Sequence, residues 1–249
     1  MAESSLSPAL RKRIAGLVPA TPPSRFTLGA ERLDAVLGGG LARARMHEIW
    51  PAQEADQASA AGFALMLAVR AAGPEGTIFW IADEAGQRHT GPIHPPGLAE
   101  LGADPGRFLF VTVPDEKALV RIAGDVVRSP AAGTAVIAAG GPARVLDLTA
   151  SRRLTLFAER SGVTAILLRT RDPQAPSAAA TRWQVSTAPS IPLEADAPGH
   201  PAFAVDLVRQ RAGAPSPGWQ LEWRRDAATF TSLPRSVPAA AGGGFVASA

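Results

Sequence analysis

The chain has 249 residues, of which 46% are hydrophobic and 19% charged, which is enough for one substantial buried core. It contains no cysteine, and this excludes a disulfide framework, thiolate metal sites and cysteine nucleophiles. The formal net charge is only +3, although the calculated isoelectric point is about 10.4, because nearly all basic residues are arginine and there is no tyrosine. The sequence shows neither a signal-peptide core nor a transmembrane stretch, so we expect a cytoplasmic protein without membrane contact.

The N-terminal part predicts an arm followed by a short helix and a turn. Residues 4–18 have the pattern of a short amphipathic helix, and the Pro-rich residues 19–24 that of a connector, so we place a helical arm and linker at residues 1–24. A helix carrying Leu33, Val36 and Leu37 then ends at three successive glycines, residues 38–40, which permit positive φ and a sharp reversal.

Strands and helices alternate from residue 46 to residue 169. The spacing of Leu119, Ile122, Ala123 and Val126 predicts a helix after Pro114 with one buried face. The other expected elements are strands at 46–50, 77–82, 108–113, 134–138 and 163–169, helices at about 56–72 and 145–161, and a Gly/Pro-broken loop at 86–97. Near-continuous apolar strands separated by helices predict an α/β fold, with a mainly parallel sheet flanked by helices on both faces.

The pattern changes after residue 169. Residues 182–188, 203–211, 218–224 and 228–230 predict antiparallel strands, and the segment APSPG predicts the hairpin loop between the second and third of them. Residues 231–249 are low in complexity and predict a disordered tail. We therefore expect a single domain over residues 25–230.

The first strand leads into the position of a phosphate-binding loop that lacks the residues of one. Such a loop reads G-x-x-x-x-G-K-[ST], in which backbone N–H groups and a lysine hold the phosphates. This chain instead reads PAQEADQAS over residues 51–59, without glycine or lysine. The degenerate loop consists of Pro51, Gln53, Glu54, Asp56, Gln57 and Ser59. Two carboxylates stand where polyphosphate charge would lie, so we expect no nucleotide cofactor bound in the usual way.

Several phrases of the sequence resemble known proteins. The strand ending WIADE (80–84), the phrase LGADPGRF (101–108) and the strand at 162–169 follow the order of a RecA-like core over about residues 25–230. Three further phrases are more specific: LGGGLARARMHEIW (37–50), ATRWQVSTAPS (180–190) and LVRQRAGAPSPGWQLEW (207–223). Together they resemble the ImuA family, RecA-like accessory proteins of inducible bacterial translesion DNA synthesis.

The resemblance implies a function and partners. It implies a non-catalytic adaptor of a damage-inducible mutagenic complex, with an ImuB-like inactive Y-family polymerase subunit and an error-prone C-family polymerase as partners. Contact with RecA or DNA, and a homo-oligomer, are left open. The nucleotide loop is commonly degenerate in that family, which agrees with the loop found in this sequence.

The residues needed for ATP hydrolysis are incomplete. In active RecA-like enzymes a hydrophobic strand ends in an aspartate that holds Mg²⁺ through water, whereas residues 135–140 here read AVIAAG. Glu84 matches the position of the carboxylate that orients the attacking water, but we interpret Asp83 and Glu84 as caps of the following segment. The four histidines are too scattered for a metal site. We therefore predict no catalytic residue and no metal, and two alternatives remain: an ATPase with an unorthodox loop and a SulA-like cell-division inhibitor.

The C-terminal hairpin holds the contact residues that we predict for a partner or DNA. Tryptophan and arginine together stack on bases or anchor protein interfaces. The candidates are Arg209, Arg211, Trp219, Trp223, Arg224 and Arg225, with the two arginines of one strand facing the tryptophans and arginines of the other. The alternation of Trp219, Leu221 and Trp223 also fits the buried face of a hairpin, and we leave both interpretations open.

Overall fold

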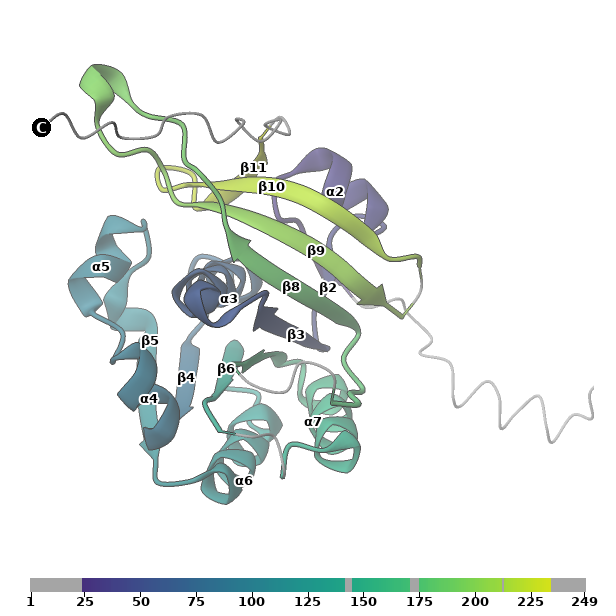
Figure 1. Cartoon of the computed structure of the whole chain (residues 1–249). Coiled ribbons are helices and arrows are strands. Elements are labelled where there is room, and N and C mark those ends of the chain that lie inside the picture. Colours follow the sequence, from purple (N-terminus) through teal and green to yellow (C-terminus); the bar gives the residue numbers. More distant parts are fainter. Residues whose placement is uncertain (1–23, 142–144, 171–174, 212, 234–249) are drawn as a thin grey trace, which may run out of the picture.

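A nine-stranded sheet forms the centre of the computed structural model, which describes residues 24–141, 145–170, 175–211 and 213–233. Its strands are β3 (Met46–Pro51), β4 (Ile78–Asp83), β5 (Phe108–Val113), β6 (Thr134–Ala139), β7 (Thr164–Arg169), β8 (Thr181–Thr187), β9 (Ala202–Gln210), β10 (Ser216–Arg224) and β11 (Thr229–Ser232). They lie in the order β11-β10-β9-β8-β3-β7-β6-β4-β5 (Figure 1). The six strands from β8 to β5 pair in parallel, and β8 to β11 pair antiparallel.

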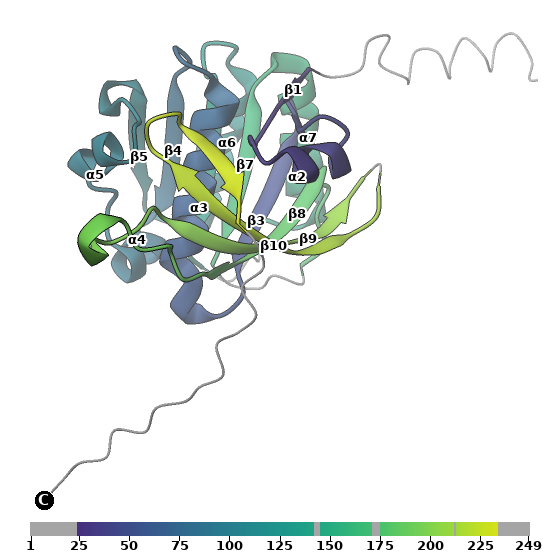
Figure 2. The ribbon, with the colours of Figure 1, turned by 90° about the horizontal axis from the view of Figure 1, so that it is seen from above.

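Helices cover both faces of the parallel part. Helix α3 (Gln57–Ala72) packs on one face, while α6 (Glu116–Arg128) and α7 (Leu148–Ser161) pack side by side on the other (Figures 1 and 2). Successive side chains of a strand point to opposite faces, so Ile166 joins the core around α3 and Leu167 joins the core beneath α6 and α7. The predicted α/β class and RecA-like core are confirmed.

The N-terminal entry is built around the three glycines. Strand β1 (Arg25–Phe26), helix α2 (Glu31–Val36) and strand β2 (Leu41–Ala42) form a small unit in which β1 pairs with β2. Gly38, Gly39 and Gly40 have φ values of 71°, 97° and 106°. A Cβ on Gly40 would lie 2.2 Å from the Phe26 carbonyl oxygen, so this turn requires glycine.

The antiparallel strands complete the core instead of forming an appendage. On α3, the Phe63 ring lies 6.1 Å from the Trp183 ring, 5.8 Å from Phe203 and 5.3 Å from Phe230, measured between centroids. Strand β11 also meets the N-terminal entry, because the Phe230 N–H donates to the Leu28 carbonyl oxygen at 2.9 Å. Both ends of the described chain therefore pack in the same core around α3.

Some expected boundaries were wrong. The expected loop at 86–97 contains α4 (Glu84–Thr90) and α5 (Pro95–Glu100), because Asp83 caps the first helix and Pro95 begins the second. Helix α7 begins at Leu148, three residues after the predicted start, where Asp147 accepts from the Ala150 N–H.

Two further findings concern the ends of the chain. Ala228 has a φ of 44° and precedes β11, so the last strand begins later than predicted and the expected tail boundary at 231 falls within it. The predicted arm helix at 4–18 and the tail beyond residue 233 lie outside the described residues. Across the ranges given above, no helix is long and apolar enough to cross a membrane.

Candidate functional site

The degenerate loop is closed by its own carboxylate. Strand β3 ends at Pro51, and a 3-10 turn at Glu54–Asp56 leads directly into α3. The buried Asp56 Oδ1 accepts from the Thr187 N–H at 2.8 Å and from the Thr187 hydroxyl at 2.9 Å. Ser59 shares a hydrogen bond of 2.8 Å with the same hydroxyl. The loop is thus fastened to β8, and a carboxylate fills the position at which a phosphate cradle would open.

The other predicted loop residues surround this fastening. Pro51 is buried at the end of β3, whereas Gln53 and Glu54 are exposed. Gln57 begins α3 and reaches a cavity of about 450 Å³ at the carboxyl ends of the parallel strands. Residues lining this cavity include Trp80, Gln87, Phe110, Gly140 and Thr170, and no described lining residue is charged. A triphosphate would find no cation there to offset its charge.

Asp83 caps the segment that follows β4. Its buried carboxylate accepts from the Gly86 N–H at 2.6 Å and the Gly140 N–H at 3.1 Å. It therefore fixes the start of α4 and holds the end of β6 beside it, as we predicted for a cap. Glu84 does not cap: it lies in the first turn of α4, half exposed, with its carboxylate 3.6 Å from Arg88.

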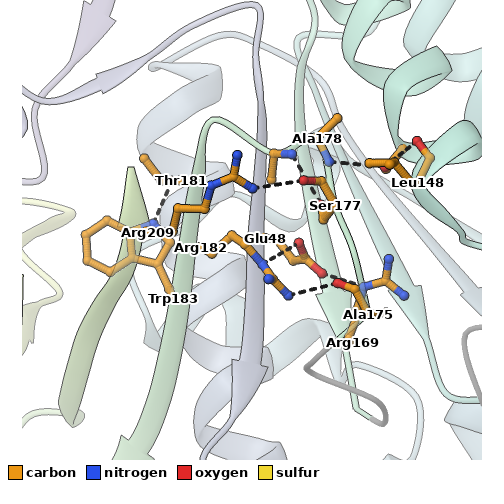
Figure 3. Close-up of polar contacts among 12 residues, drawn as sticks. Glu48, Leu148, Arg169, Ala175, Ser177, Ala178, Thr181, Arg182, Trp183 and Arg209 are labelled. Atoms are coloured by element: carbon orange, nitrogen blue, oxygen red, sulfur yellow. Dashed lines mark hydrogen bonds and ion pairs between the residues drawn. The ribbon is translucent and has the colours of Figure 1, made fainter. Parts of the chain in front are cut away.

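A buried ion cluster lies around Glu48 of β3 (Figure 3). Glu48 on β3 accepts from Arg169 Nε at 2.5 Å and from Arg182 Nε at 3.1 Å. Arg169 is fully buried and also donates to the Leu146 carbonyl oxygen at 2.7 Å. The Arg182 guanidinium lies 4.9 Å from the Trp50 ring centre. One carboxylate thus joins three neighbouring strands, and the cluster has an excess positive charge.

Sequence reasoning missed this cluster. The two arginines are 121 and 134 residues from Glu48, and spacing does not pair residues so far apart. One signal was available, because a glutamate inside an apolar strand of a sheet covered on both faces needs a buried cation. Arg169, at the end of another apolar strand, was the candidate for that buried cation.

His47 is a second buried titratable group of β3. Its ring nitrogens contact the Thr181 hydroxyl at 2.7 Å and the Ala42 carbonyl oxygen at 2.9 Å. Burial is the main cause that lowers the pKa of His47 to about 4, so the ring is neutral near pH 7. Among the described residues no group of three histidines or carboxylates is placed to hold a metal ion.

Trp223 belongs to the core and is not exposed to a partner. Its side chain is fully buried, and its indole N–H donates to the Leu101 carbonyl oxygen at 2.9 Å. Trp219 is half-buried and its indole N–H donates to the Ser216 carbonyl oxygen at 3.0 Å. Together with the fully buried Leu221, these positions agree with the alternation that we considered a buried hairpin face.

The structure does not bring the candidate arginines together. Arg209 and Arg211 lie at the end of β9, where Arg209 donates to the Ser177 carbonyl oxygen at 3.0 Å. Arg224 and Arg225 follow Glu222, which pairs with Ala202 at the start of β9. Strand β9 has nine residues, so about 25 Å separates the two pairs at ~3.3 Å per residue. The expectation that these arginines form one face was wrong, because the strands are antiparallel.

Comparison with known proteins identifies relatives over most of the chain. No family model matches the sequence. The chain is 30% identical over 217 residues to Protein ImuA from two strains of Caulobacter vibrioides, and the match covers 81% of this chain and 84% of the relative. The phrases that carry the resemblance noted in the sequence lie in the entry turn, β8 and the C-terminal hairpin, all of which pack around α3 in the structure. The chain belongs to the ImuA family.

Proposed function

We propose that this protein is a non-catalytic RecA-like accessory protein of a damage-inducible, mutagenic translesion synthesis complex. It acts by binding an ImuB-like inactive polymerase subunit, and through it an error-prone C-family polymerase. The observation that supports a non-catalytic role most directly is the bonding of Asp56 to Thr187. A loop fastened in this way presents a buried carboxylate to β8 and lacks the lysine that holds the phosphates in phosphoryl transfer.

The end of β6 supports the same proposal. It reads Ala138-Ala139-Gly140, which offers no side-chain oxygen to Mg²⁺. The nearest buried carboxylate, Asp83, already accepts two backbone N–H groups. Apart from Glu84, which is half exposed beside Arg88, each group that would serve nucleotide chemistry is therefore absent or engaged in holding the fold.

In the first test, the full chain is titrated with MgATP while its tryptophan fluorescence is recorded. Trp80 lines the cavity and would report binding there. We expect no saturable change up to millimolar nucleotide and no phosphate release. Saturable binding at micromolar concentrations, or turnover, would refute the non-catalytic role and favour the ATPase alternative.

The second test concerns the partner. The full chain is co-expressed with the ImuB-like subunit of the same genome, and we expect the two to co-purify. Arg224→Glu combined with Arg225→Glu changes one half-buried and one exposed residue of the hairpin and is expected to abolish co-elution. Lys117→Glu with Arg121→Glu, on the exposed face of α6, is the matched control. No co-elution of the unchanged chain would refute the adaptor role, and division arrest on expression would favour the SulA-like alternative.

Surface substitutions are preferred over truncation for this mapping. A chain ending near residue 171 would lack Trp183, Phe203 and Phe230, which pack against Phe63. It would also lack Arg182, one of the two cations that neutralise Glu48. Loss of binding by such a fragment would therefore not distinguish unfolding of the fragment from removal of the interface.

A further inference from the structure

Two surfaces of the described chain combine exposed apolar side chains with charged ones. One surface is positively charged and the other negatively charged. The first is a cavity of about 360 Å³ lined by residues 35–38 and 40–42, with Arg25, Arg45 and Arg211 at its edge. We call it the arginine-rimmed pocket. The second is the segment IPLEAD, residues 191–196, between β8 and β9. We call it the acidic loop.

The arginine-rimmed pocket combines an apolar lining with positive charge. Val36, 41% exposed, lies in its wall. A neighbouring hollow of about 520 Å³ shares Arg45 and Arg211, and it adds Arg152 and Leu156, the latter 50% exposed. The two hollows thus form one continuous surface with an apolar and a cationic component.

A single carboxylate balances this charge. Among the described residues, Glu159 is the only acidic one that lines either hollow, and its carboxylate lies 3.5 Å from Arg45 and 3.9 Å from Arg211. The two hollows are therefore lined by four arginines and one glutamate. The surface suits an apolar anchor flanked by carboxylates.

The acidic loop has both exposed apolar side chains and carboxylates. Ile191 is 55% exposed and Leu193 is 47% exposed, and all six residues of the loop are exposed. The Leu193 N–H donates to the Ala197 carbonyl oxygen at 2.8 Å, while Ala195 and Asp196 adopt φ values of 59° and 58°. Two adjacent non-glycine residues in the left-handed region are uncommon. The closed turn projects beyond the end of the sheet (Figure 1).

The two surfaces lie at opposite ends of the same pair of strands. The pocket includes Thr181 and Gln210, which pair at the start of β8 and the end of β9. The acidic loop follows Thr187, at the other end of the seven-residue strand β8. At ~3.3 Å per residue the separation is about 20 Å. A molecule therefore cannot place its own loop in its own pocket.

We propose that the acidic loop of one copy of this chain docks in the arginine-rimmed pocket of a second copy. Ile191 and Leu193 cover the apolar lining at Val36, while Glu194 and Asp196 of the loop meet the arginines of the rim. The contact is head-to-tail, since different surfaces of the two copies meet, and it builds open chains or closed rings. This association is independent of the proposed function.

Charge favours a second copy over the chain's own remaining segments. Residues 1–23 and 234–249 contain Arg11, Lys12, Arg13 and Arg235 but only one acidic side chain, Glu3. Basic segments are repelled by a rim of arginines. The acidic loop has the complementary charge and two exposed apolar side chains within three residues.

The test is sedimentation of the full chain across a wide concentration range. The pocket variant carries Arg152→Glu, in the neighbouring hollow, and Arg211→Glu, which lines both hollows. The loop variant carries Leu193→Ser and Glu194→Lys. Lys117→Glu with Arg121→Glu, and Glu75→Lys, are matched controls at exposed positions elsewhere. We expect the unchanged chain and the controls to associate in a concentration-dependent manner that weakens with salt. Each variant alone should associate at least about tenfold more weakly.

Mixing the two variants gives the decisive result. The pocket variant keeps an intact loop and the loop variant an intact pocket, so an equimolar mixture should form a dimer that does not extend. This recovery also shows that both variants are folded. A monomeric unchanged chain at hundreds of micromolar, variants that associate like the unchanged chain, or a mixture that stays monomeric would each overturn the proposal. Association lost on deleting residues 1–23 would also overturn it and assign the contact to that segment.

Discussion

Removal of the Glu48 carboxylate should destabilise the protein more than any surface change. Glu48→Gln keeps the size of the side chain but leaves Arg169, which is fully buried, and Arg182 without a counter-charge. An uncompensated buried charge costs about 3–5 kcal/mol. For a chain of this length that corresponds to a melting temperature lower by roughly 6–20 °C, at about 2–4 °C per kcal/mol.

The measurement is urea unfolding followed by tryptophan fluorescence, with thermal unfolding as a second probe. Glu159→Gln is the matched control, because its pairs with Arg45 and Arg211 are longer and partly exposed, and it should cost less than about 1 kcal/mol. In the double variant Glu48→Met with Arg169→Met, the part of the loss that comes from the buried Arg169 charge should be recovered, since an apolar pair replaces this ion pair at little cost, whereas Arg182 still lacks its counter-charge. A loss below about 1 kcal/mol for Glu48→Gln, or effects that simply add in the double variant, would refute this account of the cluster.

Three further predictions concern other buried positions. Because the pKa of His47 is about 4 in the folded chain against 6.5 as its ordinary value, stability is highest above pH 6.5 and should fall by up to about 3 kcal/mol as the pH falls towards 4. Urea unfolding across this range should show a smaller fall for His47→Asn, whereas the exposed control His94→Asn should behave like the unchanged chain. Gly140→Ala places a Cβ 2.0 Å from the Gly86 Cα and should lower the free energy of unfolding by about 1–3 kcal/mol or more; at Gly141, where a Cβ meets nothing within 4 Å, alanine should be tolerated in the same denaturation assay. Trp223→Ala should cost about 3–5 kcal/mol by cavity formation, and an effect no larger than that of Arg224→Ala would contradict its placement in the core.

The elements of the parallel sheet were predictable because its inner strands are buried on both faces. Runs such as Thr134–Ala139 and Thr164–Arg169 are apolar over nearly their whole length, and such runs are separated by helices with one apolar face. The glycine turn was also predictable, since three adjacent glycines have few other structural uses. These features depend on local pattern, which the sequence displays directly.

The candidate contact surface depended on relations that no local pattern displays. Alternation along β10 separates its two faces but does not show which face lies against α3, and the pairing of β9 with β10 shifts between Ser216 and Trp219. The Leu101 carbonyl oxygen that holds Trp223 comes from a loop after α5, 122 residues away. Sequence reasoning therefore named the correct hairpin residues for packing but grouped arginines that lie at opposite ends.

The meeting of β11 with the N-terminal entry also constrains how the chain acquires its structure during synthesis. The Thr229 hydroxyl donates to the Leu28 carbonyl oxygen, 201 residues earlier in the chain, and Phe230 completes the ring cluster on Phe63. A nascent chain that has released only the parallel strands still exposes one side of α3 to water. Native packing around this helix must therefore wait until the last strand leaves the ribosome, and slow, non-local closure of this kind favours engagement by chaperones before that point.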